Sequence, residues 1–88
     1  MWNLVFTKTF NKQYTKLDSE IQNRVDNAIR DLQTSEDPTK LGRPKKGMLK
    51  NMFAYNLGKY RIIYDVCRKE IIILFVYVGD HKDVYGID

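Results

Sequence analysis

The sequence predicts an α+β fold in which two N-terminal helices pack on a mostly antiparallel, four-stranded sheet. Apolar residues recur at helical spacing before residue 40, and three β-rich apolar runs follow residue 50, separated by turn residues. A chain of 88 residues has room for one hydrophobic core. We therefore expect a single domain over residues 1–88, with the element order β-α-α-β-β-β.

The N-terminal half predicts one strand and two helices. Trp2–Thr7 is short, apolar and β-rich, which is typical of a strand. The first helix is marked by three apolar residues one turn apart, Phe10, Tyr14 and Leu17. A second helix is expected to begin at Ser19, because Ser19 and Gln22 have the form of a capping box. Its apolar stripe consists of Ile21, Val25, Ala28, Ile29 and Leu32.

The C-terminal half predicts a three-stranded meander. Met52–Leu57 and Tyr60–Val66 form a hairpin around Gly58-Lys59, with glycine where a positive φ is needed. Alternation places Arg61 on the face opposite its two neighbours. Glu70–Val78 is apolar on both faces and is expected to be an interior strand that ends before Gly79. Residues 39–51 are expected to form a polar loop.

The positive charge of the chain is confined to its second half. The net charge is +4 and the isoelectric point about 9.2. Residues 1–40 carry six basic and six acidic side chains, whereas residues 41–88 carry nine and five. This excess favours a polyanionic partner, nucleic acid first and a membrane surface second; the alternative is a solvated basic face. The basic and aromatic candidates are Lys45, Lys46, Lys50, Lys59, Arg61, His81, Lys82 and Tyr85, with Tyr55 nearby.

Cysteine and histidine usage excludes several kinds of site. Cys67 is the single cysteine and His81 the single histidine, so neither a disulfide within the chain nor a protein-only zinc site is expected. We expect no metal and no cofactor. The N-terminus lacks a signal peptide, and the longest apolar run, Ile71–Val78, is too short to cross a bilayer. The expected compartment is a reducing cytoplasm.

The basic set suits metal-free cleavage of RNA by its own 2′-hydroxyl group. That reaction needs a proton acceptor, a proton donor and cations for the charge that develops on phosphorus. His81 titrates near neutrality, Arg61 binds phosphate oxygens through two donors, and Tyr85 offers a ring for base stacking. For each residue a structural role is the alternative: a solvated His81, an Arg61 paired with Asp65 or Glu70, and a Tyr85 that pins the tail.

Two motifs resemble the RelE/ParE superfamily of toxins from toxin–antitoxin systems. The first is Gly58-Lys59-Tyr60-Arg61-Ile62-Ile63-Tyr64, preceded by Gly47, Leu49-Lys50 and Met52-Phe53. The second is the tail VGDHKDVY at Val78–Tyr85. Phe6, Lys8 and Phe10, followed by Lys16-Leu17-Asp18, are similar to the opening of the family. The resemblance covers nearly the whole chain and implies the same element order.

The resemblance implies a small RelE-like toxin that a cognate antitoxin wraps and silences. The RelE branch cleaves mRNA in the ribosomal A site without a metal, whereas the ParE branch poisons DNA gyrase. The ending Lys82-Asp83-Val84-Tyr85 favours the RelE branch. The implied activity is that of an endoribonuclease (mRNA interferase) that inhibits translation, with the ribosome and mRNA as partners. Two alternatives remain, a ParE-like gyrase inhibitor and a catalytically weakened or inactivated RNA-binding member. Exposed apolar residues such as Trp2 or Tyr14 are expected under the antitoxin.

The resemblance also implies roles for individual residues. Arg61 matches the strand arginine that holds the scissile phosphate, and Tyr85 matches the C-terminal tyrosine. His81 stands where a second arginine is usual, and Lys50 matches a loop lysine. Two usual basic positions are instead Ala54 and Asn56. The site is therefore rearranged around Arg61, His81, Lys82 and Tyr85, or the member is weak or repurposed, or Ala54 is an introduced inactivating change.

Overall fold

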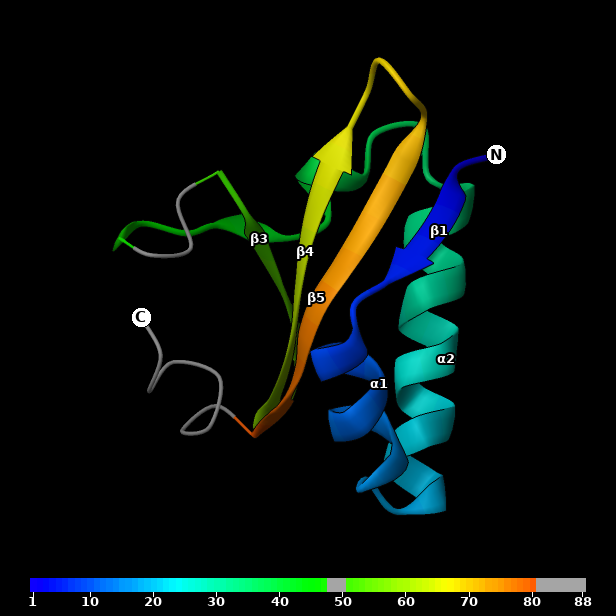
Figure 1. Cartoon of the computed structure of the whole chain (residues 1–88), viewed down its shortest axis with the longest axis vertical. Helices are drawn as coiled ribbons and strands as arrows, with labels where there is room; N and C mark the ends of the chain where they lie inside the picture. Colours follow the sequence, from blue (N-terminus) through cyan, green and yellow to red (C-terminus); the bar gives the residue numbers. More distant parts are fainter. Residues whose placement is uncertain (48–50, 81–88) are drawn as a thin grey trace.

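Both helices cover the same face of a five-stranded sheet (Figure 1). The computed structural model describes residues 1–47 and 51–80. Its elements are β1 (Asn3–Phe6), α1 (Lys8–Thr15), α2 (Ser19–Thr34), the 3₁₀ turn η1 (Pro38–Lys40), β2 (Arg43–Pro44), β3 (Phe53–Leu57), β4 (Tyr60–Cys67) and β5 (Ile72–Asp80). We call the side of the sheet that points away from α1 and α2 the far face.

The sheet is mixed, with the strand order β1-β5-β4-β3-β2. β1 pairs with β5 in parallel, and all other pairs are antiparallel. The predicted α+β class, its two layers and its element order are confirmed, and β5 is an interior strand as expected. The predicted count of four strands is one short. The missing strand, β2, has two residues and includes Pro44, so it is too short to show alternation.

Several predicted boundaries are corrected by backbone hydrogen bonding. α2 begins at Ser19 as predicted, but its cap is Asp18, whose carboxylate accepts a hydrogen bond from the Ile21 amide at 3.0 Å. The capping box does not form, since the Gln22 side chain donates instead to the Tyr14 carbonyl at 2.9 Å. Gly79 does not end the last strand; it is a buried residue within β5.

The core lies between the helices and the sheet. It is built from buried residues of α1, α2, β4 and β5: Phe10, Val25, Ala28, Leu32, Ile62, Tyr64, Ile73, Phe75 and Val78. The ring of Phe75 lies between two other rings of the core. Its centroid is 5.7 Å from that of Phe10 and 6.3 Å from that of Tyr64. Such contacts fix the sheet against the helices and so fix which β4 residues reach the far face.

Tyr64 also secures the segment before β3. Its buried hydroxyl donates a hydrogen bond to the Pro38 carbonyl at 2.7 Å. Burial raises the pKa of Tyr64 well above its ordinary value, so the hydroxyl stays protonated. A second link is the ion pair of 2.8 Å between Arg68 and Asp37. Together these contacts position η1 and, directly after it, the basic strand β2.

Candidate functional site

The far face is organised in rows of side chains that run across the strands. Ile62 and Tyr64 pack toward the helices, so Arg61 and Ile63 project from β4 to the other side. One row consists of the paired residues Asn56, Arg61 and Gly79. The next row runs through Arg43, Ala54, Ile63 and Tyr77. Arg43 therefore stands at the β2 end of its row, and Arg61 stands in the middle of the other row, on β4.

Arg61 lies beside the hairpin turn and is half-buried. Its Nη1 group donates hydrogen bonds to the carbonyls of Gly58 and Tyr60, the latter at 2.8 Å. A guanidinium has five N–H donors, and these two bonds involve one nitrogen only. The remaining edge of the group suits two oxygens of a phosphate.

No carboxylate of the described strands neutralises Arg61. Neither Asp65 nor Glu70 forms an ion pair with it, so that structural alternative is wrong. Asp65 instead accepts a hydrogen bond from the Val66 amide at 2.8 Å. Arg61 thus brings a positive charge to the far face that is paired with neither Asp65 nor Glu70.

The hairpin turn holds Arg61 in place. Leu57 pairs with Tyr60, which leaves Gly58 and Lys59 as a two-residue loop. Gly58 has a φ of +64°, a conformation that residues with a Cβ adopt rarely. The predicted turn is therefore confirmed, and its carbonyl is one of the two that orient the Arg61 guanidinium.

Ala54 and Asn56 occupy the two positions where the resemblance implies cations. Ala54 is only 1% exposed and packs with Ile63 in a small apolar cluster on the far face. Met52, Val76 and Tyr77 cover this cluster. Asn56 is exposed and stands beside Arg61 in its row. In this chain the positions therefore offer a methyl group and an amide instead of two positive charges.

The other sequence-predicted cations are only partly brought together. Lys45 continues the pairing of β2 with β3, since its amide donates to the Met52 carbonyl at 2.9 Å. Alternation places it on the same face as Arg43, and the exposed Lys46 follows it. Lys59 is not part of this group, because its ammonium lies 5.5 Å from the centre of the Tyr60 ring. Four predicted site residues lie outside the described residues: Lys50, His81, Lys82 and Tyr85.

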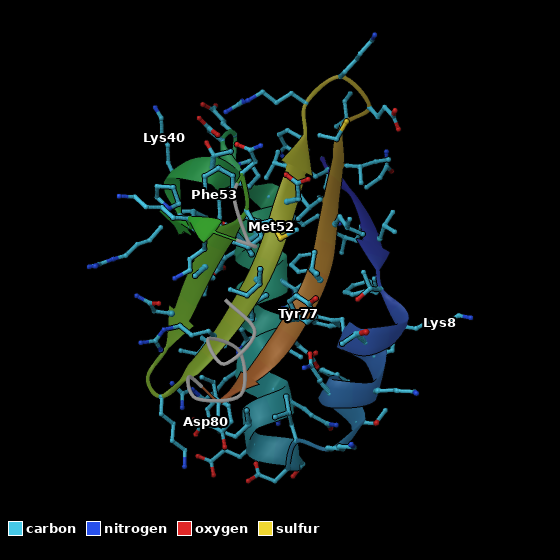
Figure 2. All side chains as sticks on the ribbon, turned by 60° about the vertical axis from the view of Figure 1, so that its left-hand side comes forward. Lys8, Lys40, Met52, Phe53, Tyr77 and Asp80 are labelled. Atoms are coloured by element: carbon cyan, nitrogen blue, oxygen red, sulfur yellow. The ribbon has the colours of Figure 1, made fainter. Side chains whose placement is uncertain are left out.

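Two far-face residues were not singled out from the sequence. Arg43 stands two positions before Lys45, and its pairing with Ala54 fixes it in the second row. Tyr77 ends the same row, and Figure 2 shows it in front of the sheet, with α2 behind. Tyr55, the aromatic that was considered, packs toward the helices instead. Strand parity alone excludes Tyr55 from the face of Arg61, because Tyr55 pairs with Ile62.

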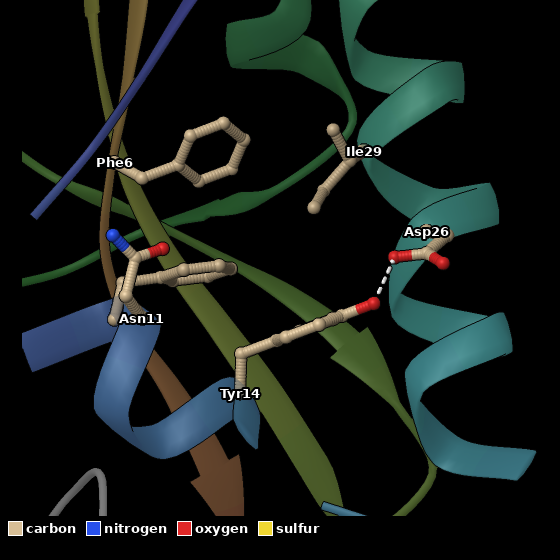
Figure 3. A pocket seen from close by; sticks show the side chains of 6 residues that line it. Phe6, Asn11, Tyr14, Asp26 and Ile29 are labelled. Atoms are coloured by element: carbon tan, nitrogen blue, oxygen red, sulfur yellow. Dashed lines mark hydrogen bonds between the residues drawn. The ribbon is translucent and has the colours of Figure 1, made fainter. Parts of the chain in front are cut away.

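A second surface lies on the helix side of the molecule. A hollow of about 170 Å³ opens between α1 and α2, lined by Phe6, Phe10, Asn11, Tyr14, Asp26 and Ile29 (Figure 3). The Tyr14 hydroxyl donates to the Asp26 carboxylate at 2.7 Å, and this bond raises the pKa of Tyr14. Phe6, which lines the hollow, is 37% exposed, whereas Val5, which alternation turns to the opposite side of β1, is 43% exposed.

The apolar residues expected to be exposed were misassigned. Trp2 and Tyr14 are both half-buried. The Trp2 indole donates a hydrogen bond to the Ser35 carbonyl at 2.9 Å and so closes β1 onto the end of α2. The exposed apolar residues of this region are Val5 and Phe6.

Within residues 1–47 and 51–80, no group of three or more histidine, cysteine, aspartate or glutamate side chains is placed to hold a metal ion. In the same part of the chain, no helix is long and apolar enough to span a membrane.

Residues 4–85 match the family model described as the ParE toxin of the type II toxin–antitoxin system parDE. This chain belongs to the RelE/ParE toxin superfamily. The matched range begins in β1 and ends at the last residue of the tail motif Val78–Tyr85, so it includes both motifs found in the sequence. No curated protein sequence matches this toxin.

Solved structures agree with this assignment. The RelBE2 toxin–antitoxin complex of Mycobacterium tuberculosis aligns with a TM-score of 0.78 and 26% identity over 90% of each chain. The RelB–RelE complex of Methanococcus jannaschii aligns with a TM-score of 0.70 and 26% identity, over 94% of this toxin and 96% of that chain. A YoeB/ParE toxin from Agrobacterium tumefaciens shares the fold, with a TM-score of 0.75 and 20% identity over 92% and 99%.

Proposed function

We propose that this toxin is a metal-independent, ribosome-dependent mRNA endoribonuclease that inhibits translation in the cytoplasm. The observation that supports this best is the state of Arg61, whose guanidinium is oriented by two carbonyls and neutralised by neither Asp65 nor Glu70. Arg43 on the neighbouring row extends the positive surface by one more phosphate contact. A surface of this charge attracts the RNA backbone.

The proposed reaction is an internal transesterification. The 2′-oxygen of the RNA forms a bond to phosphorus while the bond from phosphorus to the 5′-oxygen breaks. One group accepts the proton of the 2′-hydroxyl, and another donates a proton to the leaving 5′-oxygen. Arg61 stabilises the extra negative charge of the phosphorane through two N–H donors. His81 and Tyr85 are proposed, from their positions in the sequence, for the two proton transfers and for stacking.

The lysines are proposed to supply positive field around the RNA. Lys45 and Lys46 follow Arg43 along the chain and extend the same surface. Lys50 and Lys82 are added from the sequence pattern. Lys59, whose ammonium lies against the Tyr60 ring, is assigned an outer contact with RNA that runs past the turn. Since Ala54 and Asn56 carry no charge, we expect slower cleavage than a site with two more cations would give.

A cognate antitoxin is proposed as the stable partner of the toxin. Two similar structures, from Mycobacterium tuberculosis and Methanococcus jannaschii, are complexes of a toxin with its antitoxin. In this chain the exposed Val5 and Phe6 and the adjoining hollow present apolar surface that a partner helix or strand would cover.

The test is primer-extension mapping of a defined mRNA on programmed ribosomes. Cuts are expected when the A site is vacant and are expected to disappear when a tRNA occupies it. Arg61→Ala should abolish the cuts. Arg30→Ala removes the same charge from an exposed position of α2 and should leave them unchanged. Equal cutting by the wild type and Arg61→Ala would refute the role of Arg61.

The second candidate function is inhibition of DNA gyrase. Two observations favour it: the family description names the parDE system, and Ala54 and Asn56 lack the charge that a ribonuclease site would use. A supercoiling assay with purified gyrase separates the two functions. Inhibition of supercoiling, with no cuts on ribosomes at any toxin concentration, would replace the ribonuclease proposal by this one.

A further inference from the structure

A β-bulge fixes the orientation of Tyr77. Ile63 pairs with Tyr77 and Tyr64 with Phe75, so Val76 has no partner on β4. The extra residue interrupts the alternation, and Val76 and Tyr77 both project to the far face. Without it, the alternation that follows from the helix-facing Phe75 would turn Tyr77 toward the helices.

The bulge is held by two side chains on the helix side. The Thr7 hydroxyl, which also caps α1, donates a hydrogen bond to the Val76 carbonyl at 2.8 Å. Gln13 of α1 accepts one from the Val78 amide, also at 2.8 Å. These bonds satisfy the Val76 carbonyl and the Val78 amide at the point where the pairing with β4 is irregular. Hydrogen bonds with Thr7 and Gln13 therefore stabilise the bulge that turns Tyr77 to the far face.

Tyr77 lies on the same face as the two far-face arginines, at the β5 end of the row whose β2 end is Arg43. It is a diagonal neighbour of Arg61, because Arg61 pairs with Gly79, two residues along β5. Such neighbours on one face are about 7–8 Å apart. Along its own row, Tyr77 is three strands from Arg43, or about 14 Å at the usual strand spacing. Ala54 and Ile63 form a low apolar floor between them.

The Tyr77 side chain is half-buried, and in the described part of the chain its hydroxyl forms no hydrogen bond. A ring that only closes the cluster of Ala54 and Ile63 would not need to be aromatic, since leucine covers a similar area. A flat ring on the same face as two arginines is an arrangement that binds single-stranded nucleic acids, with a base on the ring and phosphates on the cations.

We infer that Tyr77 is a stacking platform for one unpaired base of the RNA, while Arg61 and then Arg43 bind phosphates of the strand as it crosses the sheet from β5 toward β2. This inference rests on the proposed ribonuclease function and adds a positioning residue to it. The contact is through the face of the ring, so it favours bound RNA without selecting a sequence. Stacking also anchors the chain one diagonal step from Arg61, which aligns the phosphate there for attack.

The test measures binding of a short, fluorescein-labelled, 2′-O-methylated RNA by anisotropy at low ionic strength. Tyr77→Leu keeps the apolar cover and removes the ring, and should weaken binding by about 5- to 100-fold. Tyr77→Phe should bind like the wild type. Tyr55→Leu removes a half-buried tyrosine that packs toward the helices and serves as the matched control. Thermal melting checks that each variant is folded.

A second measurement leaves the protein unchanged. The same RNA is prepared as a series in which one base at a time is replaced by an abasic site. For the wild type, one position should lose affinity more than the others, and Tyr77→Leu should no longer distinguish that position. In a Trp2→Phe background, Tyr77→Trp should show quenched fluorescence on RNA binding, which a purely structural side chain would not show.

The outcomes separate the two proposals. If Arg61→Ala weakens RNA binding while Tyr77→Leu and the abasic series have no effect, the platform is refuted and the ribonuclease proposal stands. If the wild type binds no RNA and cuts none on ribosomes, both are refuted. Loss of binding in Tyr77→Leu that Tyr77→Phe restores, together with one sensitive abasic position, supports the platform.

Discussion

Gly42 and Tyr64 are expected to be energetically coupled, because the structure leaves no space for a methyl group between them. A Cβ at residue 42 would be in hard contact with the Tyr64 hydroxyl oxygen, and 3.1 Å from both Tyr64 Cζ and the Ala54 carbonyl oxygen. The hydroxyl has no room to move aside without losing its bond to the Pro38 carbonyl. Gly42→Ala should therefore destabilise the protein by about 1–3 kcal/mol.

Tyr64→Phe removes the hydroxyl and leaves the Pro38 carbonyl without its buried partner, at a cost of about 1–3 kcal/mol. In this background the closest contact of the new methyl group is gone, and only the two contacts of 3.1 Å remain. The double variant should thus be more stable than the sum of the two single effects predicts, by about 1 kcal/mol.

The assay is urea unfolding followed by circular dichroism and by the fluorescence of Trp2. The double-mutant cycle compares the wild type, both single variants and the double variant at one temperature. Gly42→Ala combined with Tyr14→Phe, which removes the hydrogen bond to Asp26 on the helix side, is the control and should be additive. Additive effects of Gly42→Ala and Tyr64→Phe would refute the placement of η1 and β2 described here, and with it the far-face position of Arg43.

Three further outcomes are expected. Ile71 is 51% exposed with a φ of +57°, so Ile71→Gly should stabilise the protein by about 0.5–1 kcal/mol in the same assay, while Ile71→Ala, which keeps the strain, should not. The Thr39 hydroxyl and Arg68 lower the pKa of Asp37. The contribution of ionised Asp37 to stability should therefore be complete above the pKa of an unfolded aspartate and be lost as the pH falls through the lower pKa of the folded state. Asp37→Asn should flatten this loss in a pH series of thermal melts. Ala54→Arg should destabilise the protein by about 1–3 kcal/mol because residue 54 is closed over by the apolar cluster of the far face, and stability equal to the wild type would show that the cluster opens easily.

The sequence was sufficient to predict those helices and strands that are long enough for their hydrophobic periodicity to be recognised. The stripe over residues 19–34 predicts α2, and alternation predicts the hairpin and the orientation of Arg61. Turn chemistry was decisive at Gly58, because a positive φ at that position selects glycine. What could not be predicted depends on pairing between distant segments, as with β2, which exists only because β3 is beside it.

The candidate site divides in the same way. Arg61 followed from its motif and from strand parity, which are local properties. Tyr77 could not be found, because a bulge of one residue decides which face it takes, and that bulge depends on hydrogen bonds from Thr7 and Gln13. The state of Arg61 was also open in sequence, where an ion pair with Asp65 or Glu70 was the alternative to phosphate binding. The roles of His81 and Tyr85 stay predictions.

The packing around Ala54 bears on why this member lacks two usual cations. A long basic side chain at residue 54 would need an open path to solvent. Here Met52, Val76 and Tyr77 instead close over residue 54 until 1% of it is exposed. The neighbours therefore fit a small, uncharged residue at this position. The same row has an aromatic ring at residue 77. We therefore expect this row to contribute stacking of a base, where a cation at residue 54 would contribute attraction of phosphate.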